Sequence, residues 1–582
     1  MLIVSTLAIF STWVVMAIAL LGIGSIFRGL LSRECFIADA FWMGLCVSVG
    51  VLEIWNLFLP ITSAATVLLL CAGLLGLLVN RLFLLDNLRT RSRPSGWLML
   101  SGVSIVLFIA FRATGPCDHV DTGLYGASAV RWILTYPAVP GLANLQGRLG
   151  FNSSVFLCIA ALGQGVWKDL GHHLFTGFVM AAMCVTILPA CARVIARSPA
   201  SPTDWFHSIL AIPVFFWAAR SRIVGTQTDE PATIACLVAA GIVFDALRRR
   251  KDDGERNSET PRMAVATSLF ALAVAFKLST IVFALLAWCL AFRGICAMSR
   301  SMPKRWMYIA GALTISLAIL LPWYTRGIIL SGYPLFPATS LSFPFDWKTP
   351  PDVANWYAAG VRSWGRIPDA PPAETRGLAW LGVWSSSAIR NRVSFQVPLA
   401  ISLGGLAVAL GFRIRGNFRE ACPWLWLLLP SLAGVVFWFV ASPDMRFGQF
   451  AIWTTAGTLG SWGIVAATSE HRSGHTGAAM AMLLGLLVWC LISFGWKEPY
   501  RALGSMKELP ALPKADVTVR ETISGLGVYV PAQGNLCWDA PLPCTPYFDE
   551  TLRLRKGPSM RWGFASEQRA DNLQRYWSST TR

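Results

Sequence analysis

The sequence predicts an all-α protein that crosses a membrane many times, and two features of the chain support this fold class. Of its 582 residues, 55% are hydrophobic and 14% are charged, whereas charged residues make up about a quarter of a typical soluble chain. The apolar residues also gather in long runs, and about 20 of them suffice for a helix to cross the bilayer core. This composition excludes a soluble enzyme, a disordered chain and a fibrous protein. We expect about 14 transmembrane helices, at residues 2–26, 39–60, 62–85, 96–112, 174–196, 205–220, 231–247, 263–276, 278–293, 306–323, 396–412, 422–441, 447–466 and 476–496.

The first run, residues 2–26, begins where a secretory signal peptide would begin. It has no basic segment ahead of it and is longer than the apolar part of a signal peptide, which spans about 7–15 residues. We therefore expect it to stay in the mature protein. With the next two spans it forms an N-terminal group of extra membrane helices, residues 1–95.

Basic residues predict the orientation of the helices. They cluster in five loops between expected spans, and strict alternation places all five loops on one face. Lys and Arg are enriched on the cytoplasmic side of membrane proteins, where anionic lipids attract them. This bias accounts for the net charge of +18, so we expect membrane lipids and no nucleic acid as partners. The residues are Arg28 and Arg33; Arg89, Arg91 and Arg93; Arg248, Arg249, Arg250 and Lys251; Arg300, Lys304 and Arg305; and Arg413, Arg415 and Arg419.

The exterior face then carries both termini, the loops 113–173 and 324–395, and the tail 497–582. Residues 151–167 are apolar enough for a short span, but a span there would invert every later loop. We therefore expect a helix that lies at the outer membrane interface or dips into it.

The tail, residues 497–582, is expected to form a small exterior α+β domain, because apolar residues alternate in it as they do in half-buried strands. Most of the 14 cysteines lie inside apolar runs and are expected to be packing residues, and none has the spacing of a metal site. Cys537 and Cys544 lie in the tail and are candidates for a disulfide in an oxidising compartment, with two reduced thiols as the alternative.

Polar residues on the exterior face are the candidates for chemistry. The loop after the fourth span contains Asp118 and Asp121. Two carboxylates three residues apart can share a divalent cation such as Mg²⁺ or Mn²⁺, or one can act as a general base while the other adjusts its pKa. A capping Asp in a solvated loop is the alternative.

A second exterior turn carries Asp229 and Glu230 beside two arginines. Thr228 or Asp229 can cap the helix that begins near Pro231. An acidic pair at the end of a membrane helix is also a candidate for positioning a substrate or a cation.

Two cations complete the exterior set. Lys277 lies between two apolar runs that are short for membrane spans. A lysine at membrane depth is a candidate functional residue, with snorkelling as the alternative. Arg446 follows Asp444 and can hold a phosphate through two hydrogen bonds, whereas a simple pair with Asp444 is the alternative.

Carboxylates and cations gathered at one membrane face suit an enzyme that takes a lipid phosphate from the outer leaflet. The cations neutralise the leaving phosphate, and a carboxylate deprotonates the acceptor hydroxyl. A transporter would instead place its charges near the midplane, in helices broken by Gly or Pro.

At these residues the sequence resembles the GT-C class of integral-membrane glycosyltransferases, which use polyprenyl-phosphate-linked sugars. In that class an Asp near the start of the first large exterior loop is the catalytic carboxylate, and Asp121 in Val-Asp-Thr-Gly-Leu-Tyr matches it. Asp229 and Glu230 match the acidic residues of the second exterior loop, and Arg446 matches a late exterior arginine. The resemblance implies a GT-C-like catalytic core over residues 96–496.

The chain is also similar to an uncharacterised group of bacterial polytopic membrane proteins, in segments 140–154, 331–337 and 537–546. It differs from the usual GT-C pattern by about three extra spans ahead of the catalytic loop.

The expected function is a hexosyl or pentosyl transfer in the bacterial inner membrane, with the site facing the periplasm. The resemblance implies an undecaprenyl-phosphate sugar as donor and a cell-envelope glycan, lipid or protein as acceptor. The roles it implies are general base for Asp121, assisted by Asp118; acceptor or cation positioning for Asp229 and Glu230; and binding of the donor phosphate for Arg446 and Lys277.

Two other functions remain open. An O-antigen ligase or polymerase uses diphosphate-linked donors and usually depends on Arg and His instead of a loop carboxylate. A lipid-linked glycan flippase or transporter would use the same charges to line a path.

Overall fold

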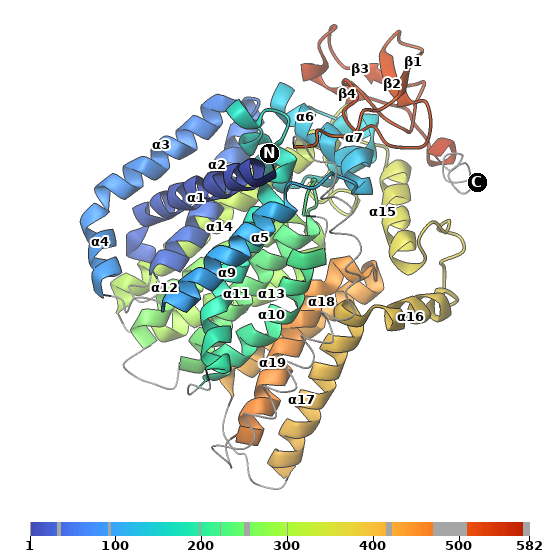
Figure 1. The fold of residues 1–582 in the computed structure, drawn as a ribbon. Coiled ribbons are helices and arrows are strands. Elements are labelled where there is room, and N and C mark those ends of the chain that lie inside the picture. The colour runs from blue at the N-terminus through green and yellow to red at the C-terminus, as the bar shows by residue number, and fades with distance from the viewer. Residues whose placement is uncertain are drawn as a thin grey trace.

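Apolar runs in a membrane fold into helices because lipid offers no hydrogen-bond partners to the backbone. The computed structural model of the chain is accordingly built mainly of helices, with a small sheet region near its C-terminus (Figure 1). It describes residues 2–31, 36–90, 95–196, 200–220, 223–249, 256–299, 301–414, 422–468 and 509–573.

Each predicted span within these residues overlaps one α-helix, except that 62–85 overlaps two helices, Ser63–Val79 and Arg81–Thr90, and the predicted span 476–496 lies outside the described residues. Eight of the described helices are long and apolar enough to cross a membrane, or up to nine if the bent pair α3–α4 forms one span. The larger count of 14 stays a prediction. The helices found at the predicted spans, whether or not they are long enough to cross a membrane, are α1 (Leu2–Ile26), α2 (Phe36–Phe58), α3 (Ser63–Val79), α4 (Arg81–Thr90), α5 (Gly96–Arg112), α9 (Phe175–Ile195), α10 (Pro202–Arg220), α11 (Asp229–Arg249), α12 (Arg256–Phe276), α13 (Ile281–Met298), α14 (Met302–Ser331), α17 (Val397–Ile414), α18 (Leu428–Ala441) and α19 (Gln449–Thr468).

Helix α11 runs through the middle of the bundle and fixes where the charges at its ends lie. Every residue from Pro231 to Leu247 is buried, and α11 packs on α9, α10, α12 and α19. Its first residue, Asp229, is therefore held at one end of the bundle, and Arg249 at the other.

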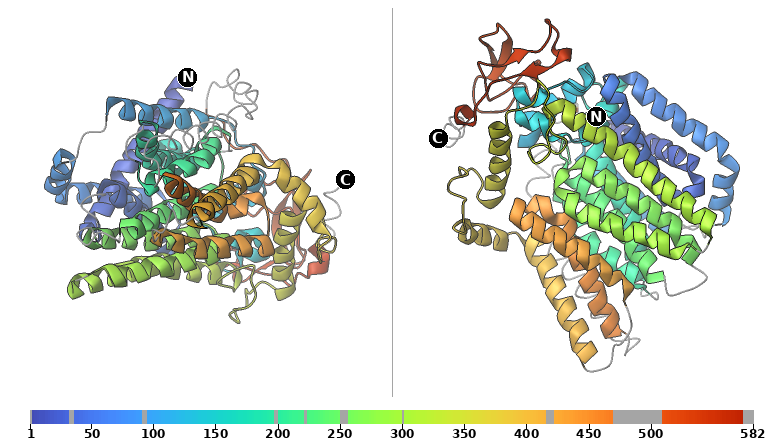
Figure 2. Two further views of the ribbon diagram at one scale, coloured as in Figure 1. Left: turned by 90° about the horizontal axis from the view of Figure 1, so that it is seen from below. Right: turned by 180° about the vertical axis from the view of Figure 1, so that it is seen from behind.

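The end of the bundle that holds Asp229 also carries the long connecting segments, and we call it the loop end. These segments pack on one another: Asn144 Nδ2 donates to the carbonyl oxygens of Trp347 and Phe564 at 2.9 and 3.2 Å. Figure 2 shows the C-terminal sheets beside the segment from α6 to α8. The elements of the loop end are α6 (Ala127–Thr135), α7 (Leu142–Leu145), α8 (Val155–Leu162), α15 (Pro351–Arg366), α16 (Trp380–Arg390) and residues 509–573.

The apolar segment 151–167 does not form a span. Its helix, α8, has eight residues, too few to cross a bilayer at 1.5 Å per residue. Residues Val155 to Ala161 are buried against α2, α3, α6 and α9, so this helix faces protein instead of the lipid interface expected from the sequence.

Helix α14 is longer than its apolar run predicts, and it continues past residue 323 to Ser331. The predicted span was too short because Arg326, a buried charged residue, interrupts the apolar pattern. Its Nη1 donates to Asn152 Oδ1 at 2.6 Å and its Nε to Asn56 Oδ1 at 3.1 Å. Because these amide oxygens satisfy the guanidinium, the helix carries it without breaking.

The described part of the C-terminal tail forms two small antiparallel sheets with short helical turns. Strand β1 (Val517–Glu521) pairs with β2 (Gly527–Pro531), as the alternating valines predict, and β3 (Arg553–Leu554) pairs with β4 (Phe564–Ala565). Val528, Leu552 and Phe564 belong to the main apolar core. The tail is therefore docked on the loop end and shares its core.

Candidate functional site

Asp121 immediately precedes a helical turn, Thr122–Gly126, that leads into α6. Thr122 fixes this turn, because its Oγ1 accepts the N–H of Thr226 at 3.0 Å. Gly126 allows the Thr226 side chain to lie close to this turn, because a Cβ atom at position 126 would be 1.9 Å from Thr226 Oγ1. The Asp121 turn and the segment that leads into α11 therefore form one unit, although about 100 residues separate them in sequence.

Arg446 joins this unit from the far end of the chain. It lies in the turn Met445–Gly448, and Asp444 caps that turn by accepting the N–H of Arg446 at 2.9 Å. The guanidinium Nη1 is 3.3 Å from Asp121 Oδ2, and Nη2 is 3.4 Å from Asp444 Oδ2. Arg446 thus makes the pair with Asp444 that the sequence offered as the alternative, and it also pairs with Asp121. Burial alone would lower the pKa of Arg446, but Asp229, Asp444 and Asp121 raise it above its usual value.

Lys277 pairs with Asp229, the first residue of α11. Lys277 lies between two helices, as its place between two apolar runs indicated, but both helices are longer than those runs. Helix α12 begins at Arg256 and α13 continues to Met298, so Lys277 falls in the turn between them at the loop end.

Phe447 lies between the two cations of the site. Lys277 Nζ is 4.1 Å and the Arg446 guanidinium carbon 5.3 Å from the centroid of its ring. Both distances are within the range of a cation–π interaction. The ring spaces the two cations apart while favouring both charges.

The remaining predicted residues lie at the edges of this cluster. Glu230 follows Asp229 in α11, and its Oε2 is buried with no hydrogen-bond partner among the described residues. Asp118 is exposed. Of the two carboxylates in this loop, Asp121 is the one that forms the ion pair with Arg446. The described residues contain no group of three or more His, Cys, Asp or Glu side chains that could hold a metal ion. The cation that the structure places on Asp121 is the guanidinium of Arg446.

Tyr125 and Arg148 also belong to the site, and neither was singled out from the sequence. Tyr125 follows Asp121 by one helical turn, and its hydroxyl lies within electrostatic reach of Asp121, Asp229, Arg148 and Arg446. Burial raises the pKa of Tyr125, and the charges of Asp121 and Asp229 raise it further. Tyr125 is therefore a neutral hydrogen-bond donor at physiological pH.

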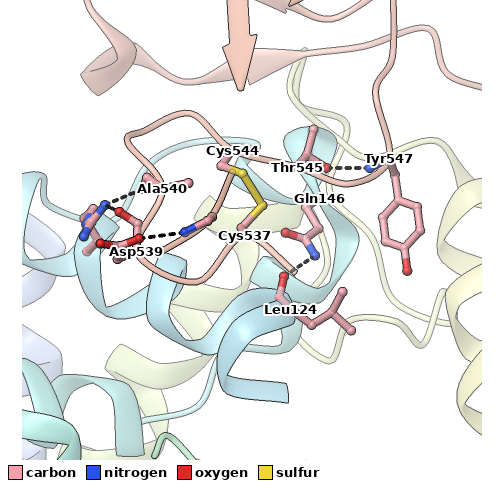
Figure 3. Close-up of a disulfide and its surroundings, with 10 residues drawn as sticks. Leu124, Gln146, Cys537, Asp539, Ala540, Cys544, Thr545 and Tyr547 are labelled. Atoms are coloured by element: carbon pink, nitrogen blue, oxygen red, sulfur yellow. Dashed lines mark hydrogen bonds between the residues drawn. A yellow bond between two sulfur atoms is a disulfide. The ribbon is translucent and has the colours of Figure 1, made fainter. Parts of the chain in front are cut away.

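The C-terminal tail supports the Asp121 turn from outside (Figure 3). Cys537 and Cys544, the pair that the sequence indicated, are joined by a disulfide. Within the loop that this bond closes, the N–H of Trp538 donates to the carbonyl oxygen of Gly123 at 2.9 Å. Arg131 of α6 donates to the carbonyl oxygens of Asp539 and Ala540. These contacts couple the disulfide loop to the residues that carry Asp121.

The fold and these contacts define a multi-pass helical membrane protein with a cluster of paired charges at one end of its bundle. A family model described as "Domain of unknown function (DUF8201)" matches residues 7–453, and the chain belongs to this family. The match includes Asp121, Asp229, Lys277 and Arg446. Neither a curated protein nor a solved structure matches the chain.

Proposed function

We propose that this protein is a GT-C-like glycosyltransferase of a bacterial inner membrane, with about 14 spans and the loop end in the periplasm. It would move a sugar from a polyprenyl-phosphate donor to a hydroxyl of a cell-envelope glycan, lipid or protein. The observation that carries the proposal is the position of Arg446, shared between Asp121 and Asp444 beside the Lys277–Asp229 pair.

The shared arginine links proton transfer to departure of the phosphate. Asp121 takes the proton of the acceptor hydroxyl as the acceptor oxygen bonds to the anomeric carbon. The bond between that carbon and the phosphate oxygen breaks, and its electron pair leaves with the phosphate. When Asp121 is protonated it no longer neutralises Arg446, so the positive charge of Arg446 becomes available as the leaving phosphate gains negative charge.

The other side chains have supporting roles in this proposal. Lys277, held beside Phe447, adds a second cation for the leaving phosphate. Asp229 positions Lys277, and Glu230, whose Oε2 has no partner in the described structure, can accept a hydrogen bond from the acceptor. The proposal assigns no step to a divalent cation, and the carboxylate–cation pairs alone support it.

The proposal is tested by turnover of lipid-linked sugars. Purified protein in nanodiscs is incubated with polyprenyl-phosphate sugars and a hydroxyl acceptor fraction from the envelope, and release of polyprenyl phosphate is followed by mass spectrometry. A deletion strain should accumulate the donor in its lipid extract. Transfer only from diphosphate-linked donors would favour an O-antigen ligase or polymerase. Movement of the lipid across the membrane without covalent transfer would favour a flippase or transporter.

A further inference from the structure

Arg148 is the one site cation that carries no ion pair within the described structure. It lies half-buried in the turn Gly147–Phe151. Its Nη1 donates to Tyr547 Oη at 2.7 Å, and its guanidinium carbon is 5.7 Å from the centroid of the Tyr547 ring. A phenol is neutral at physiological pH and does not compensate a positive charge. Withdrawing a guanidinium from water is costly unless acceptors or a paired carboxylate compensate it. The buried Arg326 has two amide oxygens as acceptors, whereas Arg148 has one phenol oxygen and the charge of Asp121, with which it forms no ion pair. This difference favours an additional anionic partner for Arg148.

The two other cations differ from Arg148 in this respect. Arg446 has two carboxylates, and Lys277 has one. Both are therefore largely neutralised before any substrate arrives. A guanidinium has five N–H donors, and Arg148 uses one of them on Tyr547. It has the charge and the donors that an incoming oxyanion needs.

The turn that carries Arg148 lies against the turn that follows Asp121. Gln146 Nε2 donates to the carbonyl oxygen of Leu124 at 3.0 Å, and the ring centroids of Phe151 and Tyr125 are 6.1 Å apart. Asp121 and Arg148 are close enough to interact electrostatically, and no closer pair between them forms. The charges of Asp121, Arg148 and Arg446 all act on the Tyr125 hydroxyl. An oxyanion bound by Arg148 would therefore lie beside the carboxylate that the proposed reaction uses as its base.

The partner of Arg148 comes from the C-terminal tail. Tyr547 follows the disulfide loop, and its N–H donates to Thr545 Oγ1 at 3.1 Å, which places it next to Cys544 (Figure 3). Tyr547 is 399 residues from Arg148 in sequence. The tail thus supplies a side chain to the site in addition to supporting the Asp121 turn.

We propose that Arg148, oriented by Tyr547, binds a phosphate oxyanion of the lipid-linked substrate, with the Tyr125 hydroxyl as a second donor. This inference rests on the proposed function for the identity of the lipid, but the oxyanion site itself depends only on the contacts of Arg148. Arg148 and Arg446 would then hold the phosphate from two sides, with Arg148 binding it in the ground state and Arg446 acting as it leaves.

The test measures binding, so it does not require turnover. Thermal stabilisation of the full-length protein in nanodiscs is titrated with a polyprenyl monophosphate, with the matching uncharged polyprenol and with inorganic phosphate. A hydrogen-bonded contact to a charged group corresponds to about a 10- to 100-fold change in affinity. We expect Arg148→Gln to weaken binding of the polyprenyl monophosphate by that factor, and Tyr547→Phe to weaken it less. Arg376→Gln, which changes an exposed arginine of the loop end, should leave the affinity at the wild-type value.

Arg148→Lys keeps the charge and guards against a folding defect, and we expect its affinity to fall between the wild type and Arg148→Gln. Wild-type affinity in both Arg148→Gln and Tyr547→Phe would overturn the inference, as would equal stabilisation by polyprenol and polyprenyl monophosphate. Arg148-dependent binding in a protein that transfers no sugar would support the oxyanion site and refute the proposed function. Arg148-dependent binding of inorganic phosphate alone would point to a free phosphate as the ligand and refute the lipid-linked substrate.

Discussion

Replacing Asp121 by asparagine separates its chemical role from its structural one. The ion pair with Arg446 spans 3.3 Å between side chains that are 36% and 39% exposed, and an exposed pair of this kind contributes about 0–1 kcal/mol to stability. Loss of a general base costs about a hundred- to ten-thousand-fold in rate, which is about 2.7–5.4 kcal/mol in the activation barrier. Asp121→Asn should therefore melt within a few degrees of the wild type and lose at least a hundred-fold in transfer rate.

The assay is release of polyprenyl phosphate by purified protein, with thermal melting measured on the same samples. Asp369→Asn is the matched control, because Asp369 is an exposed carboxylate of the loop end with φ 65°, a conformation that asparagine tolerates. Asp118→Asn should be milder than Asp121→Asn, since Arg446 pairs with Asp121. A folded Asp121→Asn protein that transfers sugar at a near wild-type rate would refute the assignment of the base.

Three further predictions concern the neighbours of the site. Arg446→Lys should weaken binding of polyprenyl monophosphate by on the order of 1–3 kcal/mol, because lysine lacks the planar pair of donors. An unchanged affinity in the nanodisc titration would show that Arg446 only pairs with Asp121 and Asp444 and does not bind the phosphate. In Gly123→Ala, the new Cβ would lie 2.6 Å from the Trp538 ring, so we expect a loss of about 1–3 kcal/mol and a lower Tm that adding Trp538→Ala partly restores; no recovery in the double variant would contradict this contact. Finally, Arg555 donates two hydrogen bonds of 2.9 Å to Asp346 and lowers the pKa of that carboxyl. The stability from this pair is present above the unfolded pKa of about 4 and is lost as the pH falls through the depressed folded pKa. Because Asp346 is exposed, the pair contributes at most about 1 kcal/mol to the free energy of unfolding. The Tm difference between the wild type and Arg555→Gln should thus shrink between pH 6 and pH 3; a constant difference would argue against the pair.

The helices were predictable because membrane burial leaves a strong apolar pattern, but their ends were not. Arg326 ended the predicted span at residue 323, whereas α14 continues to Ser331 because two amide oxygens receive the guanidinium. Asn56 and Asn152 lie far from Arg326 in sequence, so periodicity carries no information about them. The same reasoning explains Lys277, whose partner Asp229 is 48 residues away.

The site was partly predictable, since acidic and basic residues at the ends of apolar runs must meet at a membrane face. That argument selected Asp121, Asp229, Lys277 and Arg446, which the structure brings together. This argument did not select Arg148, because Arg148 lies within a loop, away from the end of any span. The available signal was a single charged residue in an otherwise uncharged segment, Leu142 to Phe156.

The distribution of charge along α11 bears on the choice between an enzyme and a transporter. At the loop end the helix carries Asp229, paired with Lys277. At its other end Asp245 pairs with Arg248, Arg249 and Arg262. The sequence between, from Pro231 to Phe244, contains no charged residue, and all of it is buried. A path for a charged headgroup would require polar groups along such a central helix. Charges confined to its two ends instead favour a substrate that enters and leaves at one face, where the carboxylates and cations of the loop end already meet.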